Sequence, residues 1–129
     1  MLLKQLWNGH EKDSVSDNTE LFELRELIRM YKKGQDIKGK IRCNPHIHNQ
    51  YVHALLIIRN SKYPITAKNV SKKCDISSYK VRQLYYEGLA EIARRGPDHR
   101  HRYVDSETGE GLLMGLNLPP SLLVPEGDA

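Results

Sequence analysis

The stretch TAKNVSKKCDISSYKVRQL, residues 66–84, decides the fold that this 129-residue chain is expected to adopt. Thr66 stands where a hydroxyl can cap the start of a helix, and Ser77 or Ser78 can cap a second one. Asp75 lies between them and is one of the few non-glycine residue types that tolerate a left-handed backbone. Apolar residues at helical spacing give each helix an inner face: Val70, Cys74, Ile76, Val81 and Leu84. The stretch therefore predicts two short helices joined by a tight turn.

A β-hairpin is expected shortly after these helices. Residues 92–95 and 100–104 have the character of two strands, and Gly96 with Pro97 marks a tight turn between them. Gly88 precedes the hairpin, in a region where the apolar residues still keep a helical period. We expect the second helix to span residues 77–89, because continuation through Gly88 costs about 1 kcal/mol relative to alanine. The alternative is that Gly88 ends the helix in a left-handed cap.

Residues 50–104 resemble the core of winged helix-turn-helix transcriptional regulators of the bacterial or phage type. The resemblance rests on the capped helix pair and the hairpin, and it covers about two-fifths of the chain. Residues 79–82 and 94–96 are also similar, at fewer positions, to small regulators of bacterial fimbrial operons. The chain departs from the family pattern at Ser71, where alanine is usual, and at Gly88. The resemblance implies a mainly α fold with a small β-wing, preceded by an N-terminal helix.

The resemblance also implies a surface that binds double-stranded DNA. In that family the second helix lies in the major groove, the first crosses the phosphate backbone, and the wing contacts phosphates or the minor groove. Carried over position by position, the implied DNA-binding residues are Thr66, Lys68, Ser77, Ser78, Tyr79, Lys80, Arg82, Gln83, Tyr86, Arg94, Arg95, Arg100 and Arg102. The implied function is sequence-specific regulation of transcription.

The charge distribution agrees with a nucleic-acid ligand. Residues 59–104 hold eleven lysines and arginines against four acidic residues, whereas residues 105–129 hold five acidic residues and no lysine or arginine. A basic segment followed by an acidic one is typical of a protein whose end stays away from the polyanion. No enzyme is expected, because the sequence lacks a phosphate-binding glycine loop, a metal-binding histidine–glutamate helix and a nucleophile elbow.

Two other interpretations of residues 50–104 stay open. In the first interpretation, the helix pair is an ordinary helical hairpin whose apolar spacing matches the motif by chance. In the second, the domain is a winged-helix module that binds proteins or single strands. Single-strand binding needs exposed aromatic rings on which bases stack, and Tyr79, Tyr86 and Tyr103 are the candidates. Duplex binding with a steep salt dependence favours the regulator over both alternatives.

A longer helix is expected over residues 18–34. Asp17 or Asn18 can cap its start, and Gly34 can close its end. Its apolar stripe consists of Leu21, Leu24, Leu27, Ile28 and Tyr31. This stripe packs on the same chain or pairs with a second copy. We expect a homodimer, because a linker of residues 35–49, with glycines and a proline, separates the helix from the core.

The two ends of the chain are expected to lie outside this core. Residues 1–17 form an N-terminal arm, and residues 105–129 form an acidic and then apolar tail that begins with a polar linker, residues 105–110. In residues 112–124 the prolines and glycines exclude a long helix. This apolar segment docks on the dimer, binds the transcription machinery or another regulator, or is disordered in isolation.

One constellation suggests a different chemistry. Cys43, His46, His48 and His53 are close enough in sequence to suggest zinc, which accepts thiolate and imidazole ligands. Structural zinc sites usually have regularly paired ligands, which this sequence lacks, so neither a metal nor a cofactor is expected. The two cysteines lie in unrelated settings, and there is no secretory segment and no apolar run of about eighteen residues. The sequence therefore predicts one cytoplasmic domain with no membrane partner.

Overall fold

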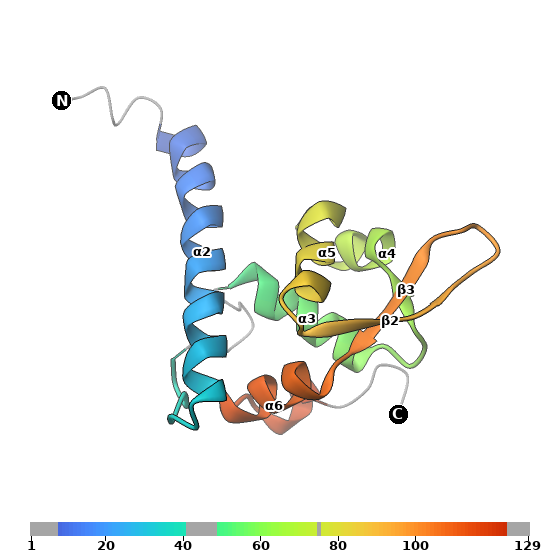
Figure 1. Cartoon of the computed structure of the whole chain (residues 1–129). Helices are drawn as coiled ribbons and strands as arrows, with labels where there is room; N and C mark the ends of the chain where they lie inside the picture. Colours follow the sequence, from blue (N-terminus) through green and yellow to red (C-terminus); the bar gives the residue numbers. More distant parts are fainter. Residues whose placement is uncertain (1–7, 41–48, 75, 124–129) are drawn as a thin grey trace.

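The computed structural model describes residues 8–40, 49–74 and 76–123, with side chains described from residue 19 onward. In this part of the chain, five α-helices are combined with a three-stranded antiparallel sheet (Figure 1). The elements are α2 (Asn8–Lys32), α3 (Gln50–Asn60), β1 (Ile65–Thr66), α4 (Ala67–Lys73), α5 (Ser78–Tyr86), β2 (Ala90–Arg95), β3 (His101–Asp105), α6 (Glu107–Gly115) and the 3-10 helix η1 (Pro120–Leu123). A mainly α fold with a small sheet and an N-terminal helix is confirmed. Across the described residues, the helices are too short or too polar to cross a membrane.

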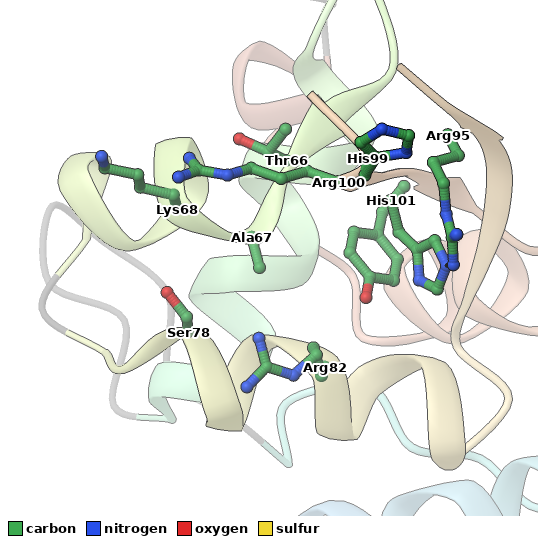
Figure 2. A pocket seen from close by; sticks show the side chains of 10 residues that line it. Thr66, Ala67, Lys68, Ser78, Arg82, Arg95, His99, Arg100 and His101 are labelled. Carbon is green, nitrogen blue, oxygen red and sulfur yellow. The ribbon is translucent and has the colours of Figure 1, made fainter. Parts of the chain in front are cut away.

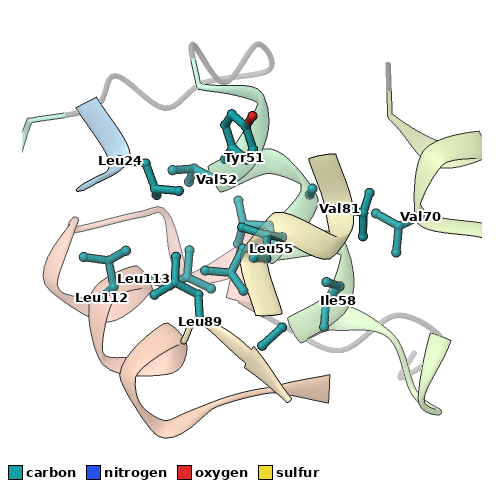
Figure 3. Close-up of a cluster of buried hydrophobic side chains, with 14 of the residues drawn as sticks. Leu24, Tyr51, Val52, Leu55, Ile58, Val70, Val81, Leu89, Leu112 and Leu113 are labelled. Atoms are coloured by element: carbon teal, nitrogen blue, oxygen red, sulfur yellow. The ribbon is translucent and has the colours of Figure 1, made fainter. Parts of the chain in front are cut away.

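Helix α3 is the centre of the core. Asn49 is fully buried and caps this helix, because its side-chain oxygen accepts a hydrogen bond from the backbone N–H of Tyr51 at 2.9 Å. Its amide nitrogen donates to the backbone oxygen of Glu20 and to the carboxylate of Glu23, each at 3.0 Å, which ties α3 to α2. Helices α2, α4, α5 and α6 and strand β3 all pack around α3 (Figure 3). The described residues therefore share one hydrophobic core.

The two predicted helix caps on either side of α4 are present. The hydroxyl of Thr66 accepts a hydrogen bond from the backbone N–H of Asn69 at 3.2 Å, and α4 begins one residue after Thr66. The hydroxyl of Ser77 accepts from the N–H of Lys80 at 3.2 Å, so Ser77 and not Ser78 caps α5. Each cap satisfies an amide that has no partner within its own helix.

The turn between α4 and α5 is braced by Ser71. Its hydroxyl donates a hydrogen bond to the carbonyl oxygen of Ile76 at 2.6 Å, and the side chain of Ile76 is buried. An alanine at this position has no donor to offer, so the departure from the family pattern has a local structural role. Asp75, expected to supply the left-handed residue of the turn, lies outside the described residues.

The expected continuation of the second helix through Gly88 is wrong. Helix α5 ends at Tyr86, and Gly88 has a φ of 83°, a left-handed conformation that glycine adopts at little cost. The N–H of Leu89 then donates to the carbonyl of Leu84 at 2.9 Å, which closes the helix. This turn buries Leu89 and lets β2 begin at Ala90.

The expected hairpin is present as β2 and β3. The sheet order is β1-β3-β2, and Tyr103 in the central strand lies opposite both Ile65 and Ile92. The hairpin projects to one side of the molecule (Figure 1). Strand β1 was not expected from the sequence, because two residues are too few to show an alternating pattern.

The start expected for the N-terminal helix is wrong. Helix α2 begins at Asn8, so Asp17 and Asn18 lie within it, and part of the expected arm is helical. The expected end is confirmed: Gly34 has a φ of 76° and follows the last helical residue closely. Relative to the helices packed against α3, the first turns of α2 extend outward (Figure 1).

The apolar stripe of α2 is mostly buried in its own chain. Leu24 is fully buried, Leu27 and Ile28 nearly so, and α2 packs against α3 and α6. These three residues therefore pack on their own chain, whereas Leu21 and Tyr31 stay partly exposed, and pairing of the stripe with a second copy stays a prediction. A homodimer stays a prediction without an assigned interface.

The polar linker expected at residues 105–110 is wrong, because α6 begins at Glu107. Ser106 caps α6 by accepting a hydrogen bond from the N–H of Gly109 at 2.9 Å. The leucines that follow are buried in the core: Leu112, Leu113, Leu116 and Leu118. Gly109 and Gly111 allow this, because a Cβ would meet the backbone oxygen of Leu89 at the first and the ring of Tyr31 at the second. The segment packs on its own chain, so its leucines are not exposed for a dimer or a partner.

Candidate nucleic-acid interface

An open groove of about 500 Å³ lies between α4, α5 and the β2–β3 hairpin, and we call it the hairpin groove (Figure 2). It is lined by Thr66, Ala67, Lys68, Ser78, Arg82, Arg95, His99, Arg100, His101 and Tyr103. Four of these described lining residues carry a permanent positive charge and none is a carboxylate. Because like charges face one channel there, the groove attracts a polyanion.

Helix α5 supplies one wall of the hairpin groove. Ser78 and Arg82 are one helical turn apart, so both face the hairpin. Burial raises the pKa of Tyr103, and the positive charge of Arg82 acts against this shift. The phenol of Tyr103 is therefore neutral at physiological pH, and Tyr103 and Arg82 line the same groove.

The hairpin supplies the opposite wall. Nη2 of Arg95 lies 3.0 Å from Nε2 of His101, so these side chains hold each other across the two strands. Arg100 extends over α4 toward Lys68 (Figure 2). His99 has a φ of 61°, the left-handed conformation that allows the chain to turn back here. Basic groups from the hairpin and from α4 thus converge above α5.

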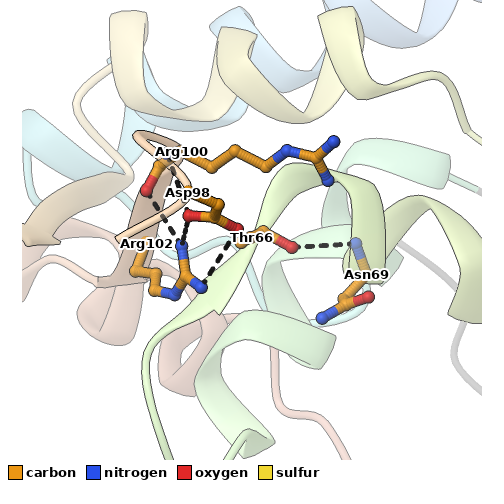
Figure 4. Close-up of polar contacts among 5 residues, drawn as sticks. All are labelled: Thr66, Asn69, Asp98, Arg100 and Arg102. Atoms are coloured by element: carbon orange, nitrogen blue, oxygen red, sulfur yellow. Dashed lines mark hydrogen bonds and ion pairs between the residues drawn. The ribbon is translucent and has the colours of Figure 1, made fainter. Parts of the chain in front are cut away.

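Arg102 shapes the hairpin turn (Figure 4). Its Nη1 lies 3.0 Å from Oδ1 of Asp98 and donates to the backbone oxygen of Arg100 at 2.9 Å. The hydrogen bond from Arg102 lowers the pKa of Asp98 to about 2. A Cβ at Gly96 would lie 2.8 Å from the guanidinium carbon of Arg102, so a larger residue there would displace this guanidinium. Arg102 is therefore engaged within the hairpin and does not line the hairpin groove.

The structure brings together six of the thirteen residues expected to bind DNA, namely Thr66, Lys68, Ser78, Arg82, Arg95 and Arg100. The other seven lie outside the lining of the hairpin groove: Ser77, Tyr79, Lys80, Gln83, Tyr86, Arg94 and Arg102. Tyr79 and Tyr86 are 64% and 68% exposed on the outermost face of α5, and Gln83 is beside them. Lys80 lies on the flank of α5 that also carries Glu87.

The hairpin groove also contains residues that were not predicted to bind. His99, His101 and Tyr103 line it from the hairpin, and Ala67 lines it from α4. The two histidines lie in the basic run of the sequence, and His101 alternates with Tyr103 along β3, so period-two spacing was an available signal. Tyr103 is only 3% exposed, which removes it from the expected stacking platform.

The zinc hypothesis gains no support. Cys43, His46 and His48 lie outside the described residues. His53 is half-buried on α3, and burial lowers its pKa. Within the described ranges, no group of three histidine, cysteine or acidic side chains is placed to hold a metal ion.

An ion pair connects α2 to the end of α5. Nε and Nη2 of Arg25 donate to Oε2 of Glu87 at 3.0 and 2.9 Å, and this contact raises the pKa of Arg25. Because the pair is exposed, its main effect is to orient the end of α5 and not to add much stability. Contacts outside the hairpin groove therefore hold both of its walls: Arg25 of α2 holds α5 through Glu87, and Arg102 holds the hairpin through Asp98.

Comparison of the chain with protein-family models, curated proteins and solved structures found no match.

Proposed function

We propose that this chain is a sequence-specific regulator of transcription that binds double-stranded DNA as a winged helix-turn-helix protein. In this proposal α5 lies in the major groove and the β2–β3 hairpin is the wing. The observation that carries the proposal is the hairpin groove, where a capped helix and a basic hairpin face one channel. The major groove is about 12 Å wide and admits an α-helix, whose diameter with side chains is about 10 to 12 Å.

The side chains divide into two roles under this proposal. Arg82 and Gln83, exposed and half-exposed in the middle of α5, reach base edges, because both side chains can make paired hydrogen bonds there. Lys68, Arg95 and Arg100 contact phosphates, which fixes the register of the protein without reading sequence. A regulator needs both kinds of contact: Arg82 lines the hairpin groove together with Lys68, Arg95 and Arg100, and Gln83 follows Arg82 on α5, outside the lining of the groove.

Selection of bound duplexes from a random pool tests the proposal and returns the site. We then expect Arg82→Ala and Gln83→Ala each to weaken binding of the selected site by about 1 to 3 kcal/mol. Lys38→Ala is the control, because Lys38 is an exposed basic residue and is separated in sequence from all residues that line the hairpin groove. Wild-type affinity of both α5 variants for the selected duplex, with normal folding, would contradict the placement of α5 in the major groove.

A second candidate function is single-strand binding. The exposed rings of Tyr79 and Tyr86 on the outermost face of α5 favour it, since bases stack on such rings for about 1 to 3 kcal/mol each. Competition between a duplex and its separated strands distinguishes the two functions. A preference for single strands that is lost in Tyr79→Ala with Tyr86→Ala would replace the regulator with this alternative.

A further inference from the structure

A second open groove lies on the neighbouring face of α4, and we call it the outer groove. Its cavity volume is about 330 Å³, and it runs between residues 61–65 and the exposed side of α4. Thr66 lines both grooves, so they meet at the start of α4. Both grooves therefore border the start of α4, and a duplex that passes this point can contact both.

The charge of the outer groove matches that of the hairpin groove. Lys72 and Lys73 form the last turn of α4, and both are exposed. Lys68 and Lys72 are four residues apart, so they lie one above the other on α4 and connect the two grooves. Among its described lining residues there is no carboxylate. Arg102 also lines this groove, but its charge is already matched by Asp98.

The remaining groups of the outer groove suit a sugar–phosphate chain. Asn69 is exposed between the lysines and offers amide donors, and Tyr63 is 68% exposed at the rim. Nζ of Lys62 lies 5.8 Å from the centre of the Tyr63 ring. A site for a small apolar ligand is lined mainly by hydrophobic side chains. The outer groove instead has ammonium, amide and phenol groups around an open channel.

We propose that the outer groove is a second binding surface for the phosphate backbone of the same nucleic acid, beyond the segment held in the hairpin groove. The proposal rests on the proposed function, since it requires that the hairpin groove binds a duplex. The adjacency of the two grooves at Thr66 favours one long polyanion over a separate acidic protein. The bound duplex then extends past the base pairs that α5 reads, and its flank is held by Lys72 and Lys73 without sequence preference.

Lys72→Ala combined with Lys73→Ala tests the outer groove. Duplexes that carry the selected site are shortened stepwise from each end, and affinity is measured over a range of salt concentrations. We expect the double variant to keep the selected sequence and to flatten the slope of log affinity against log salt, by about one for each lysine that contacts a phosphate. Shortening one flank should weaken binding of the wild type and leave binding of the variant unchanged.

The control is Lys32→Ala with Lys33→Ala, which removes two exposed lysines at the end of α2 and should keep the wild-type slope. Lys72→Gln with Lys73→Gln repeats the test with side chains that keep helix propensity. A wild type that binds no duplex overturns the proposed function. A wild type that binds the selected duplex, with double variants of unchanged slope at every length, overturns the outer groove alone. Lysine-dependent binding of polyglutamate with unchanged duplex binding also overturns it, in favour of an acidic protein partner.

Discussion

At the scale of single residues, Asp98 and Arg102 fix the hairpin turn, and their ion pair predicts how the turn responds to pH. The guanidinium lowers the pKa of Asp98 from 3.8 to about 2. Because this pKa is depressed in the folded state, the contribution of the pair is present above about pH 4 and is lost as the pH falls through about 2. We expect Arg102→Gln to return the pKa of Asp98 toward its ordinary value, measured by NMR titration of the carboxyl carbon.

Arg94→Gln is the matched control, because it removes one exposed charge from the same hairpin. The pKa of Asp98 should stay near 2 in this control. If it also stays near 2 in Arg102→Gln, the ion pair is not the cause of the shift. Arg102 would then return to the set of candidate phosphate contacts.

The sequence predicted which residues are basic or polar, but it could not predict which of their side chains are used in contacts within the chain. Arg102 is held by Asp98, and Ser77 is occupied as a helix cap. The pairing of Asp98 with Arg102 depends on a turn in which His99 takes a positive φ, and composition does not specify that geometry. Arg82 and Arg95, by contrast, are exposed on regular elements, so their position could be predicted from periodicity.

At the scale of elements, the close approach of α6 to the rest of the core predicts the effect of a small substitution. Gly109→Ala places a Cβ against the backbone oxygen of Leu89, which has no flexible end that can move away. Alanine favours an isolated helix by about 1 kcal/mol, but overpacking of this kind costs about 1 to 3 kcal/mol. We expect a net decrease in the free energy of unfolding, measured by urea denaturation.

Gly115→Ala in the same helix is the control. Its Cβ would lie 3.2 Å from the Cδ1 atom of Ile37, the end of a flexible side chain that can shift. The free energy of unfolding should therefore change less in this variant than in Gly109→Ala. Equal stability of the two variants would show that α6 does not approach Leu89 as closely as the structure places it.

Elements with local signals were predicted correctly, and elements that depend on distant contacts were not. The caps at Thr66 and Ser77 and the two strands of the hairpin each have a signal within a few residues. Gly88 was misread because apolar spacing continues across the turn at helical period, although the chain there changes to a strand. Helix α6 was missed because its glycines weaken helix propensity. Their role is to let α6 approach Leu89 and Tyr31 closely, which the sequence does not show.

At the scale of the whole molecule, residues 105–118 of the acidic C-terminal segment are part of the fold and not a separate tail. Nε of Arg59 lies 3.7 Å from Oδ2 of Asp105, and its Nη2 lies 3.6 Å from Oε2 of Glu110. Burial raises the pKa of Asp105 and Arg59 lowers it, so the ion pair acts against the cost of burying the carboxylate. The sequence showed opposite charges in consecutive segments, but it could not show that α6 folds back on α3.

The apolar stripe of α2 packs on α3 and α6, so substitutions in this stripe test the arrangement of the three helices. Leu24 is fully buried on the side of α2 that packs on α3 and α6. Leu24→Ala should therefore lower the free energy of unfolding by about 2 to 5 kcal/mol. Phe22→Ala, at a side chain 66% exposed on the same helix, should change it by about 0.5 kcal/mol or less. Because these contacts lie within one chain, the loss of stability in Leu24→Ala should be the same at every protein concentration. A wild-type unfolding midpoint that rises with concentration, together with a loss of self-association in Leu24→Ala during sedimentation, would instead show that the α2 stripe joins two copies of the chain.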